Sequence, residues 1–357
     1  MGDPRLEAYA RLLVERCVNV QPGWQVVIQS SPLARPLLEE AARAIARRGA
    51  YVLPRINFES IGHGWIREAP EELLTKMAPL ELNVRLNADA FINIDAPENT
   101  REAADIPPAR LLLARQAGQP VLKRFTNLEV PWVACVYPTP ALAQDAGMSL
   151  KAYEDFIYGA CLQDWDEVAK TMQRIADRFD RADLVRIVGH ETDITMSLKG
   201  RKGHVDDGHV NMPGGEVFYC PVEDSVEGVI SYSEFPAVWG GQDAEGVRLV
   251  FQKGKVVEAS ARRGEALLIK TLDTDPGARF LGELGIGCNP GVQRHMRNTL
   301  FDEKIDGTIH LAVGRGFPWL GGTNESAVHW DMVKDLRTGG RIYCDGELVQ
   351  ENGKWLI

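Results

Sequence analysis

Two histidines and an aspartate near the carboxyl end of the chain lie in apolar, strand-like sequence. His310 lies within TIHLAVG and His329 within SAVHWDM, where Asp331 follows two positions later. Because alternate residues of a β-strand point to the same face, His329 and Asp331 should share a face while Trp330 points the other way. Buried polar groups usually find a partner, so one interpretation is a structural histidine–carboxylate pair. The other interpretation is that these side chains bind metal.

Three glutamates lie upstream in unusual surroundings. Glu216 follows a Pro-Gly-Gly turn and precedes an apolar pair, and Glu283 lies among glycines and apolar residues in LGELGIGCN. Glu303 comes seven residues before His310. Carboxylates in such surroundings either cap turns or act as buried ligands. For Glu303, a solvated charge run is an equally good explanation.

These oxygen and nitrogen donors, with no thiol placed among them, form a set that suits a divalent ion such as zinc, cobalt or manganese. A single structural zinc ion would need a closed site with four protein ligands, which usually include cysteine. Five or six donors are enough for two ions that share a bridging carboxylate, and such a pair can activate a water and polarise a carbonyl. The residues therefore suggest a site for two divalent metal ions.

The remaining candidates are weaker. His190, His204 and His209 lie in a polar, glycine-rich region that is typical of a surface loop, although one of them could line a pocket. His63 and His295 are expected to be exposed or structural. The sequence has no GxSxG element, no GK[ST] in its glycine-rich GRGFPWLGGT segment, and no GxGxxG after the first expected strand. Serine-hydrolase, phosphate-cradle and dinucleotide sites are therefore not expected.

Composition limits the class of protein. With 45% hydrophobic and 25% charged residues, the 357-residue chain has the composition of a soluble globular protein. Its net charge of -10 argues against nucleic-acid or anionic-membrane partners, which need a basic patch. No segment approaches the ~18 apolar residues of a membrane span, and the charged N-terminal segment does not resemble a signal peptide. The six cysteines form no CxxC pair, so we expect reduced thiols and a cytoplasmic location.

The pattern of elements predicts two domains. Helices over about 4–18 and ARPLLEEAARAIARRGA alternate with short apolar strands at WQVVIQS, YVLPRIN and ADAFINIDAP, which is typical of an α/β layer with a largely parallel sheet. A long helix or helix pair is expected over 149–182. Beyond it, strands separated by Gly, Lys-Gly, Asp-Gly and Asn-Gly turns predict antiparallel sheet. We therefore expect an N-terminal α/β domain over 1–182 and a C-terminal, sheet-rich α+β domain over 183–357.

Several segments, in order, resemble the thermophilic metalloaminopeptidases of the aminopeptidase T and aminopeptidase S group. They are SLKGRK, NMPGGEVFYCPVEDSVEGVI, FDEK followed by HLAVG, and HWD, and together they cover most of residues 184–335. The first half matches in general pattern, including MSLKAYEDF. The resemblance implies a hydrolase that removes N-terminal amino acids from peptides with two metal ions held in the C-terminal domain. It also implies a homodimer around an enclosed active site.

The resemblance also assigns roles to individual residues. It places the metal ligands at Glu216, Glu283, His310, His329 and Asp331, with Glu303 as a further acidic ligand and Glu283 as the bridging carboxylate. The family carries a tyrosine, which assists the metals and the substrate oxygen, where this chain has Phe317. The segment between the two histidines is also short for the family. These departures predict a slow peptidase with an intact metal site.

Two alternatives stay open. His310, His329 and Asp331 also match the facial triad of non-haem iron oxygenases, and ring-cleaving dioxygenases for dihydroxypyridines resemble the aminopeptidase T fold. Phe317 would suit the apolar ring pocket of such an enzyme. A triad does not need Glu216 or Glu283, whereas a two-metal site does, so the peptidase is preferred. The second alternative is a catalytically silent relative that binds only peptide or metal.

Overall fold

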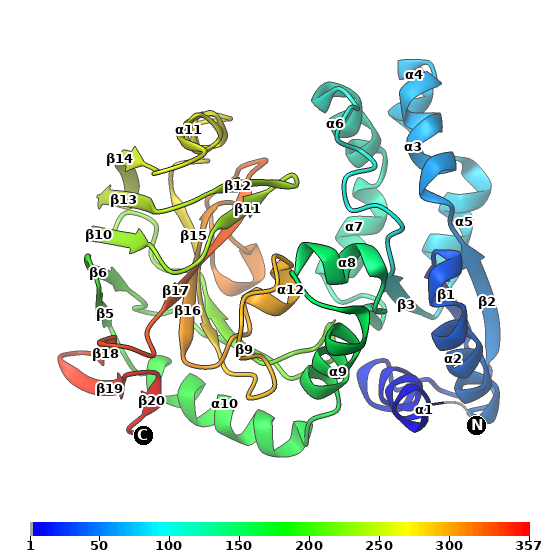
Figure 1. Cartoon of the computed structure of the whole chain (residues 1–357), viewed down its shortest axis with the longest axis horizontal. Helices are drawn as coiled ribbons and strands as arrows, with labels where there is room; N and C mark the ends of the chain where they lie inside the picture. Colours follow the sequence, from blue (N-terminus) through cyan, green and yellow to red (C-terminus); the bar gives the residue numbers. More distant parts are fainter. Residues whose placement is uncertain (1–2) are drawn as a thin grey trace. The chain divides into compact units, whose positions relative to one another are not determined.

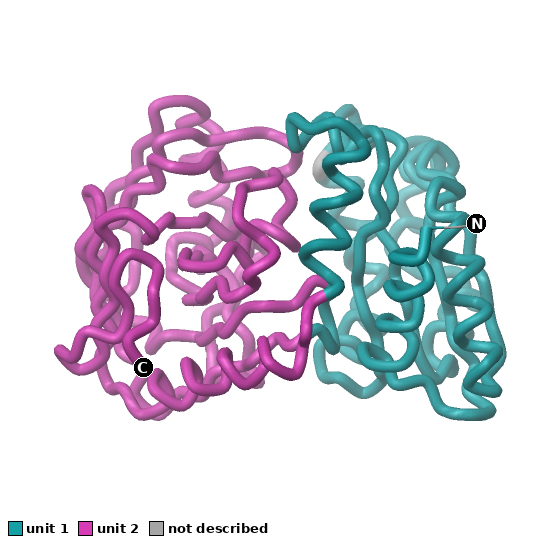
Figure 2. Tube along the Cα trace, turned by 60° about the horizontal axis from the view of Figure 1, so that its bottom comes forward, with its two compact units in different colours: residues 1–162, 208–212 teal, residues 163–207, 213–357 magenta. Residues whose placement is uncertain are grey.

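The computed structural model describes residues 3–357. The chain forms two compact units, which Figure 2 distinguishes by colour. Unit 1 contains residues up to 162 together with 208–212, and unit 2 contains residues 163–207 and 213–357.

The units separate before the long helix of residues 165–179, whereas we expected the boundary after it, at 182. This helix, α10 (Trp165–Phe179), packs on strands of unit 2. The Phe179 ring stacks on Tyr219 with centroids 5.9 Å apart, and the Tyr219 hydroxyl donates to the Ala176 carbonyl oxygen at 3.2 Å. A helix pattern does not reveal which sheet the helix covers, so this difference follows from long-range packing.

Unit 1 contains the parallel sheet that the alternating pattern predicts. Its strand order is β2-β1-β3-β4-β8, and every pair is parallel. The strands are β1 (Gln25–Ser30), β2 (Tyr51–Ile56), β3 (Ala90–Asp95), β4 (Trp132–Val136) and β8 (Asn211–Met212). The last strand comes from the short segment within the second half of the chain, so the sheet is not built from the N-terminal residues alone.

The helices of unit 1 alternate with these strands (Figure 1). Helix α2 illustrates the sequence logic, because Leu37, Leu38, Ala41 and Ile45 recur at helical spacing and are buried. The helices are α1 (Pro4–Arg11), continued by a π-helical turn (Leu12–Cys17), α2 (Arg35–Arg47), α3 (Glu59–Glu68), α4 (Glu71–Leu74), α5 (Pro79–Asn87), α6 (Pro108–Ala117), α7 (Gln119–Thr126), α8 (Pro140–Asp145) and α9 (Leu150–Cys161). Within residues 3–357, no helix has both the length and the apolar character that crossing a membrane requires.

Unit 2 contains two larger antiparallel sheets, as the turn-rich sequence predicts. The eight-stranded sheet has the order β14-β13-β10-β6-β5-β18-β19-β20, and the five-stranded sheet has the order β17-β16-β15-β9-β7. The first contains β5 (Leu184–Gly189), β6 (Thr192–Ser197), β10 (Glu227–Tyr232), β13 (Val247–Gln252), β14 (Lys255–Ser260), β18 (Arg341–Cys344), β19 (Glu347–Glu351) and β20 (Lys354–Trp355). The second contains β7 (His204–Asp206), β9 (Glu216–Tyr219), β15 (Leu281–Gly287), β16 (Thr308–Gly314) and β17 (His329–Asp335).

A small hairpin, β11 (Ala237–Trp239) with β12 (Gln242–Ala244), and two helices, α11 (Glu265–Leu272) and α12 (Thr299–Asp302), complete unit 2 together with α10 (Figure 1). One face of the five-stranded sheet is apolar and shares a single core with the eight-stranded sheet. From the five-stranded sheet this core contains Val217, Tyr219, Leu284, Ile286, Ile309, Leu311, Val313, Trp330 and Met332. The opposite face carries the polar side chains that the sequence singled out.

Candidate metal centre

Strand register brings the predicted ligands onto one face of the five-stranded sheet. Ala312 of β16 pairs with Glu283 of β15 on one side and with Asp331 of β17 on the other. Two residues along each strand, Gly314 pairs with His329, and Gly285 pairs with His310. Because strand residues alternate between faces, all four ligand candidates on β15, β16 and β17 point to the same side. Glu216 joins them from β9, opposite Gly287.

Small residues beside the ligand candidates provide the space for this arrangement. A Cβ atom at Gly285 would lie 1.9 Å from His310 Nε2, so the imidazole occupies the volume that any larger residue would fill. Ala312, between Glu283 and Asp331, leaves their two carboxylates unobstructed in the same way. Gly285 in LGELGIG is therefore part of the site, because it makes room for the His310 imidazole.

Glu283 lies between the two histidines. Its Oε1 is 3.3 Å from His310 Nε2, and its Oε2 is 3.1 Å from His329 Nε2. Each carboxylate oxygen thus faces a different imidazole, which is the arrangement that a bridging ligand requires. His329 Nε2 is also 3.8 Å from Asp331 Oδ2.

The donor atoms form two overlapping groups. One contains Glu216, Glu303 and His310, and the other contains Glu283, His310 and Asp331; within each group the donor atoms lie within 4.8 Å of one another. His310 is completely buried, whereas the His329 side chain keeps 20% of its surface exposed. The site can therefore be reached from solvent on the His329 side.

The charges of the site depend on mutual pairing. Although burial lowers the pKa values of both imidazoles, Glu283 and Glu216 raise the pKa of His310 to about 9. Asp331 and Glu283 likewise raise the pKa of His329 to about 10. Burial raises the pKa of Glu283, but hydrogen bonds from the two histidines outweigh it and lower the value to about 2. Burial raises the pKa of Asp331 and that of Glu303. Charged Glu283 and the two charged histidines thus stabilise one another, whereas the charged forms of Asp331 and Glu303 are disfavoured.

Several buried side-chain atoms of the site have no hydrogen-bond partner among the described residues. Two of them are the carboxylate oxygens Glu216 Oε2 and Asp331 Oδ1. Leaving such atoms unpaired is costly, and each one therefore needs an explanation. A divalent cation would satisfy them, so the donor set of this structure fits the metal that its residue types predict.

His329 is held in the orientation that metal binding requires. Its Nδ1 donates a hydrogen bond to the Arg315 carbonyl oxygen at 2.7 Å. This bond fixes the ring and leaves Nε2 directed at the carboxylates of Glu283 and Asp331. Metal-binding histidines characteristically donate their second nitrogen to a carbonyl or carboxylate. Residue types alone gave no indication of the role of Arg315, because its backbone makes the contact.

Phe317 lies beside the donor groups and not in the core. Its half-buried ring has its centroid 5.1 Å from that of His329, and the Phe218 and Trp319 rings lie 5.6 and 5.9 Å away. His204 packs 5.0 Å from Trp319 and 5.1 Å from Phe218. These four residues form an aromatic wall next to the site, so one of the three histidines expected in a loop does line it.

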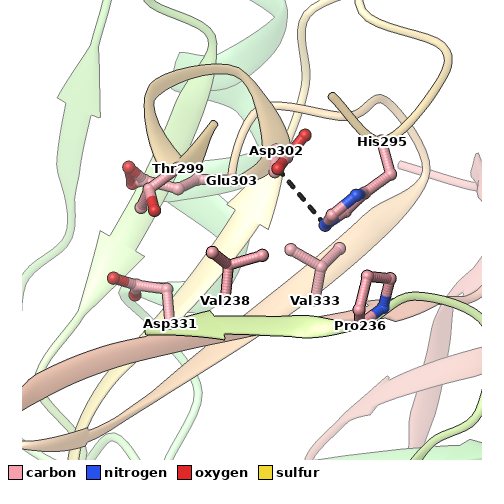
Figure 3. Close-up of a pocket in the computed structure, with 8 residues that line it drawn as sticks. All are labelled: Pro236, Val238, His295, Thr299, Asp302, Glu303, Asp331 and Val333. Atoms are coloured by element: carbon pink, nitrogen blue, oxygen red, sulfur yellow. Dashed lines mark ion pairs between the residues drawn. The ribbon is translucent and has the colours of Figure 1, made fainter. Parts of the chain in front are cut away.

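A small pocket lies beside two of the acids (Figure 3). It has about 20 Å³ of space for water, and about 10–15 Å³ is enough for one molecule. Glu303 and Asp331 line it together with Pro236, Val238, His295, Thr299, Asp302 and Val333. His295 Nε2 lies 3.2 Å from Asp302 Oδ2, and Asp302 also accepts the backbone N–H of Asn298. His295 is thus structural, since this network anchors the segment that ends in Glu303.

A buried lysine completes the site and was missed from the sequence. Lys304 Nζ donates to Glu216 Oε1 at 3.0 Å and lies 3.7 Å from Glu303 Oε2 and 3.8 Å from Asp206 Oδ2. Burial lowers its pKa, but the three carboxylates outweigh burial and raise it. Both Glu303 and Lys304 of FDEK are compatible with a solvated charge run. The sequence therefore gave no indication that Lys304 is buried.

The structure brings all six predicted ligands together, while three other histidines lie elsewhere. The His190 carbonyl oxygen accepts a hydrogen bond from Lys334, and His209 is an exposed residue of unit 1. His63 is a half-buried residue of α3.

Comparisons with known proteins find relatives that cover nearly the whole chain. Aminopeptidase 2 of Geobacillus stearothermophilus is 28% identical over 99% of this chain and 98% of that protein. The structure of wild-type AmpT from Thermus thermophilus is 24% identical, with a TM-score of 0.87 and 99% of each chain covered. The structure of 2,5-dihydroxypyridine dioxygenase from Pseudomonas putida KT2440 is 15% identical, with a TM-score of 0.65 and coverage of 100% and 98%. At these identities the two structures support the fold alone.

The family comparison covers nearly the whole chain and confirms the resemblance found in the sequence. Residues 2–355 match the thermophilic metalloproteases (M29), and the chain therefore belongs to this metallopeptidase family.

Proposed function

We propose that the protein is a metal-dependent aminopeptidase that removes N-terminal amino acids from peptides. The observation that carries this proposal is the convergence of oxygen and nitrogen donors from one sheet face and from Glu303. Five of these residues form two overlapping groups, and His329 Nε2 lies 3.1 Å from Glu283 Oε2. Membership of the metalloprotease family and the names of the relatives support the reaction type.

The donor geometry supports a division of roles among the ligands. Glu216, Glu303 and His310 would hold one ion, and His329 and Asp331 would hold the other. Glu283 would bridge them, because its two oxygens face different histidines. Zinc, cobalt and manganese all suit these donors. When bound, such a pair supplies Lewis-acid polarisation of a carbonyl and acidifies a water molecule.

The chain's own groups would do the remaining work. The attacking water must lose a proton, and the leaving amine must gain one, so a carboxylate has to carry it. Glu283 and its neighbour Glu303 are the candidates. Bridging would engage both oxygens of Glu283, whereas Glu303 also lines the small pocket that has space for water. Phe317 occupies the position of the family tyrosine but has no hydroxyl. Its apolar ring can contact a substrate side chain, whereas it cannot donate a hydrogen bond to a developing oxyanion.

The dioxygenase alternative has one observation in its favour, since His310, His329 and Asp331 do lie in one site. A facial triad leaves no role for Glu216 and Glu303, whose buried and partly buried carboxylates nevertheless lie in one donor group with His310. A two-metal site gives all six donors a role, whereas the triad gives none to Glu216, Glu283 and Glu303. We therefore prefer the peptidase.

We also propose a cytoplasmic homodimer. All six cysteines are buried, and no disulfide is found among the described residues, which suits a reducing compartment. Closed two-fold pairing is the commonest oligomer, and unit 1 exposes large apolar side chains that an interface could cover, such as Tyr51, Ile61, Trp65 and Leu80. Light scattering should give twice the chain mass of 39.5 kDa; a mass of one chain at micromolar concentration would reject the dimer.

The proposed activity can be tested with a matched pair of peptides. The purified protein, loaded with cobalt or zinc, should release the N-terminal residue from a leucyl peptide but leave the N-acetylated peptide intact. A chelator should abolish the release. Equal cleavage of both peptides, or ring cleavage of a dihydroxypyridine without peptide cleavage, would contradict an aminopeptidase.

A further inference from the structure

Lys304 differs from an ordinary lysine in its burial and in the carboxylates that surround it. Its side chain has no exposed surface, and its ammonium lies within 4 Å of carboxylates from three separate positions in the chain. Two of these carboxylates, Glu216 and Glu303, belong to one donor group of the candidate metal centre. Burying an ammonium is costly unless it is paired, so the site must gain something from this contact.

The two oxygens of Glu216 have different surroundings. Oε1 accepts the hydrogen bond from Lys304 Nζ at 3.0 Å. Oε2 lies 3.3 Å from His310 Nε2 and has no suitable hydrogen-bond donor among the described residues. The lysine thus occupies one side of the carboxylate, and the other oxygen is left directed at the donor group.

We propose that Lys304 is a positioning residue for the metal held by Glu216, Glu303 and His310: its ammonium fixes Glu216 so that Oε2 alone is presented to the ion. This inference rests on the proposed metal-dependent function. The ammonium also offsets repulsion between Glu216 and Asp206, which pair directly across β9 and β7.

A count of charges supports this role. Glu216, Glu283, Glu303 and Asp331 carry four negative charges, which two divalent ions balance. Asp206 and Lys304 then balance each other. The loaded site would be neutral with neutral histidines, and Lys304 would keep its charge because Asp206 balances it.

Two effects of removing the ammonium have opposite signs, so the experiment is decisive. Loss of positive charge would by itself strengthen cation binding, whereas loss of orientation would weaken it. Removing a partner that orients a metal ligand usually costs about 10–100-fold in metal affinity. We expect orientation to dominate, and we expect the loss to fall on one of the two ions.

The test is a titration of metal-free protein with cobalt. Binding is monitored by calorimetry and by the visible absorption of the bound ion. Lys304→Met keeps the length of the side chain and removes the ammonium. One of the two binding steps should weaken by about 10–100-fold, while the other changes little. Two unchanged steps would mean that Lys304 is only a structural cation, and a tighter step would mean that its charge opposes the metal.

Lys334 provides a matched control. It is also fully buried, and its Nζ donates to Glu234 Oε1 at 2.7 Å and to the His190 carbonyl oxygen at 3.1 Å. Lys334→Met should lower the melting temperature but leave both cobalt-binding steps unchanged. A similar loss of affinity in this variant would show that any buried lysine has the same effect and would overturn the specific role.

A second variant covers the case in which Lys304→Met does not fold. Lys304→Gln keeps an N–H donor without the charge and should weaken the same step by a smaller factor; two unchanged steps in this variant overturn the proposal. If the wild-type protein itself binds no cobalt, the proposed function fails as well. Normal binding by the wild type and by Lys304→Met would reject only the positioning role.

Discussion

Replacing Phe317 by tyrosine should turn a slow peptidase into a faster one. The ring centroid lies 5.1 Å from that of His329, and the backbone N–H of Phe317 donates to Cys220 Sγ at 3.1 Å. The backbone is therefore anchored, and the added hydroxyl would extend from a half-buried ring beside the donor groups. A hydrogen-bond donor near a developing oxyanion contributes about 10²–10³ in kcat, or ~2.7–4 kcal/mol. We expect Phe317→Tyr to approach this gain.

The assay is steady-state kinetics on leucyl and phenylalanyl amides with saturating cobalt or zinc. The gain should appear in kcat with little change in KM, because the new hydrogen bond would form mainly in the transition state. Phe218→Tyr is the control, since it adds the same hydroxyl to a neighbouring ring of the aromatic wall, 5.6 Å away. A fast wild-type enzyme that the tyrosine leaves unchanged would refute the reasoning, as would an equal gain in the control.

Three further predictions concern the ligands and their surroundings. Glu283→Gln should abolish turnover and weaken metal binding in a folded protein, because the charge is lost at nearly constant size; wild-type turnover with both ions bound would make Glu283 merely structural. Gly285→Ala should displace His310, whose Nε2 lies where the new Cβ would be, and should weaken both donor groups; cobalt affinity equal to that of the wild type would argue against this crowding. The metal-free protein should lose thermal stability as pH rises, because the pKa values of His310 and His329 are raised to about 9 and about 10. Their stabilisation is complete below the unfolded value near 6.5 and is lost through pH 9–10; a melting temperature constant from pH 6.5 to 10 would contradict the pairing.

Much of the fold could be predicted from local patterns. Apolar, strand-like runs identified β16 and β17. The alternation of side chains along a strand then placed His329 and Asp331 on one face without any knowledge of the partner strands. Alternating helices and apolar runs predicted the parallel sheet of unit 1. The domain boundary and the placement of β8 could not be predicted in the same way, because both depend on contacts between residues distant in sequence.

The candidate site likewise has a part that could be predicted from local sequence and a part that depends on long-range contacts. Residue types and the family resemblance identified all six ligand candidates, but only strand register explains why they meet, since Ala312 has to pair with both Glu283 and Asp331. Register depends on long-range packing. Lys304 and the Arg315 carbonyl were missed for a different reason. A lysine in a charged segment resembles a solvated residue, and a backbone oxygen has no residue type to recognise.

The central claim is that this sheet face binds two divalent ions. Its most direct test is the metal content of protein purified without added metal and then saturated with zinc or cobalt, measured by elemental analysis against the chain concentration. We predict two ions per chain, and binding of the second should be lost in Glu283→Gln. One iron per chain, with no second site that zinc, cobalt or manganese can fill, would contradict the account and favour the oxygenase.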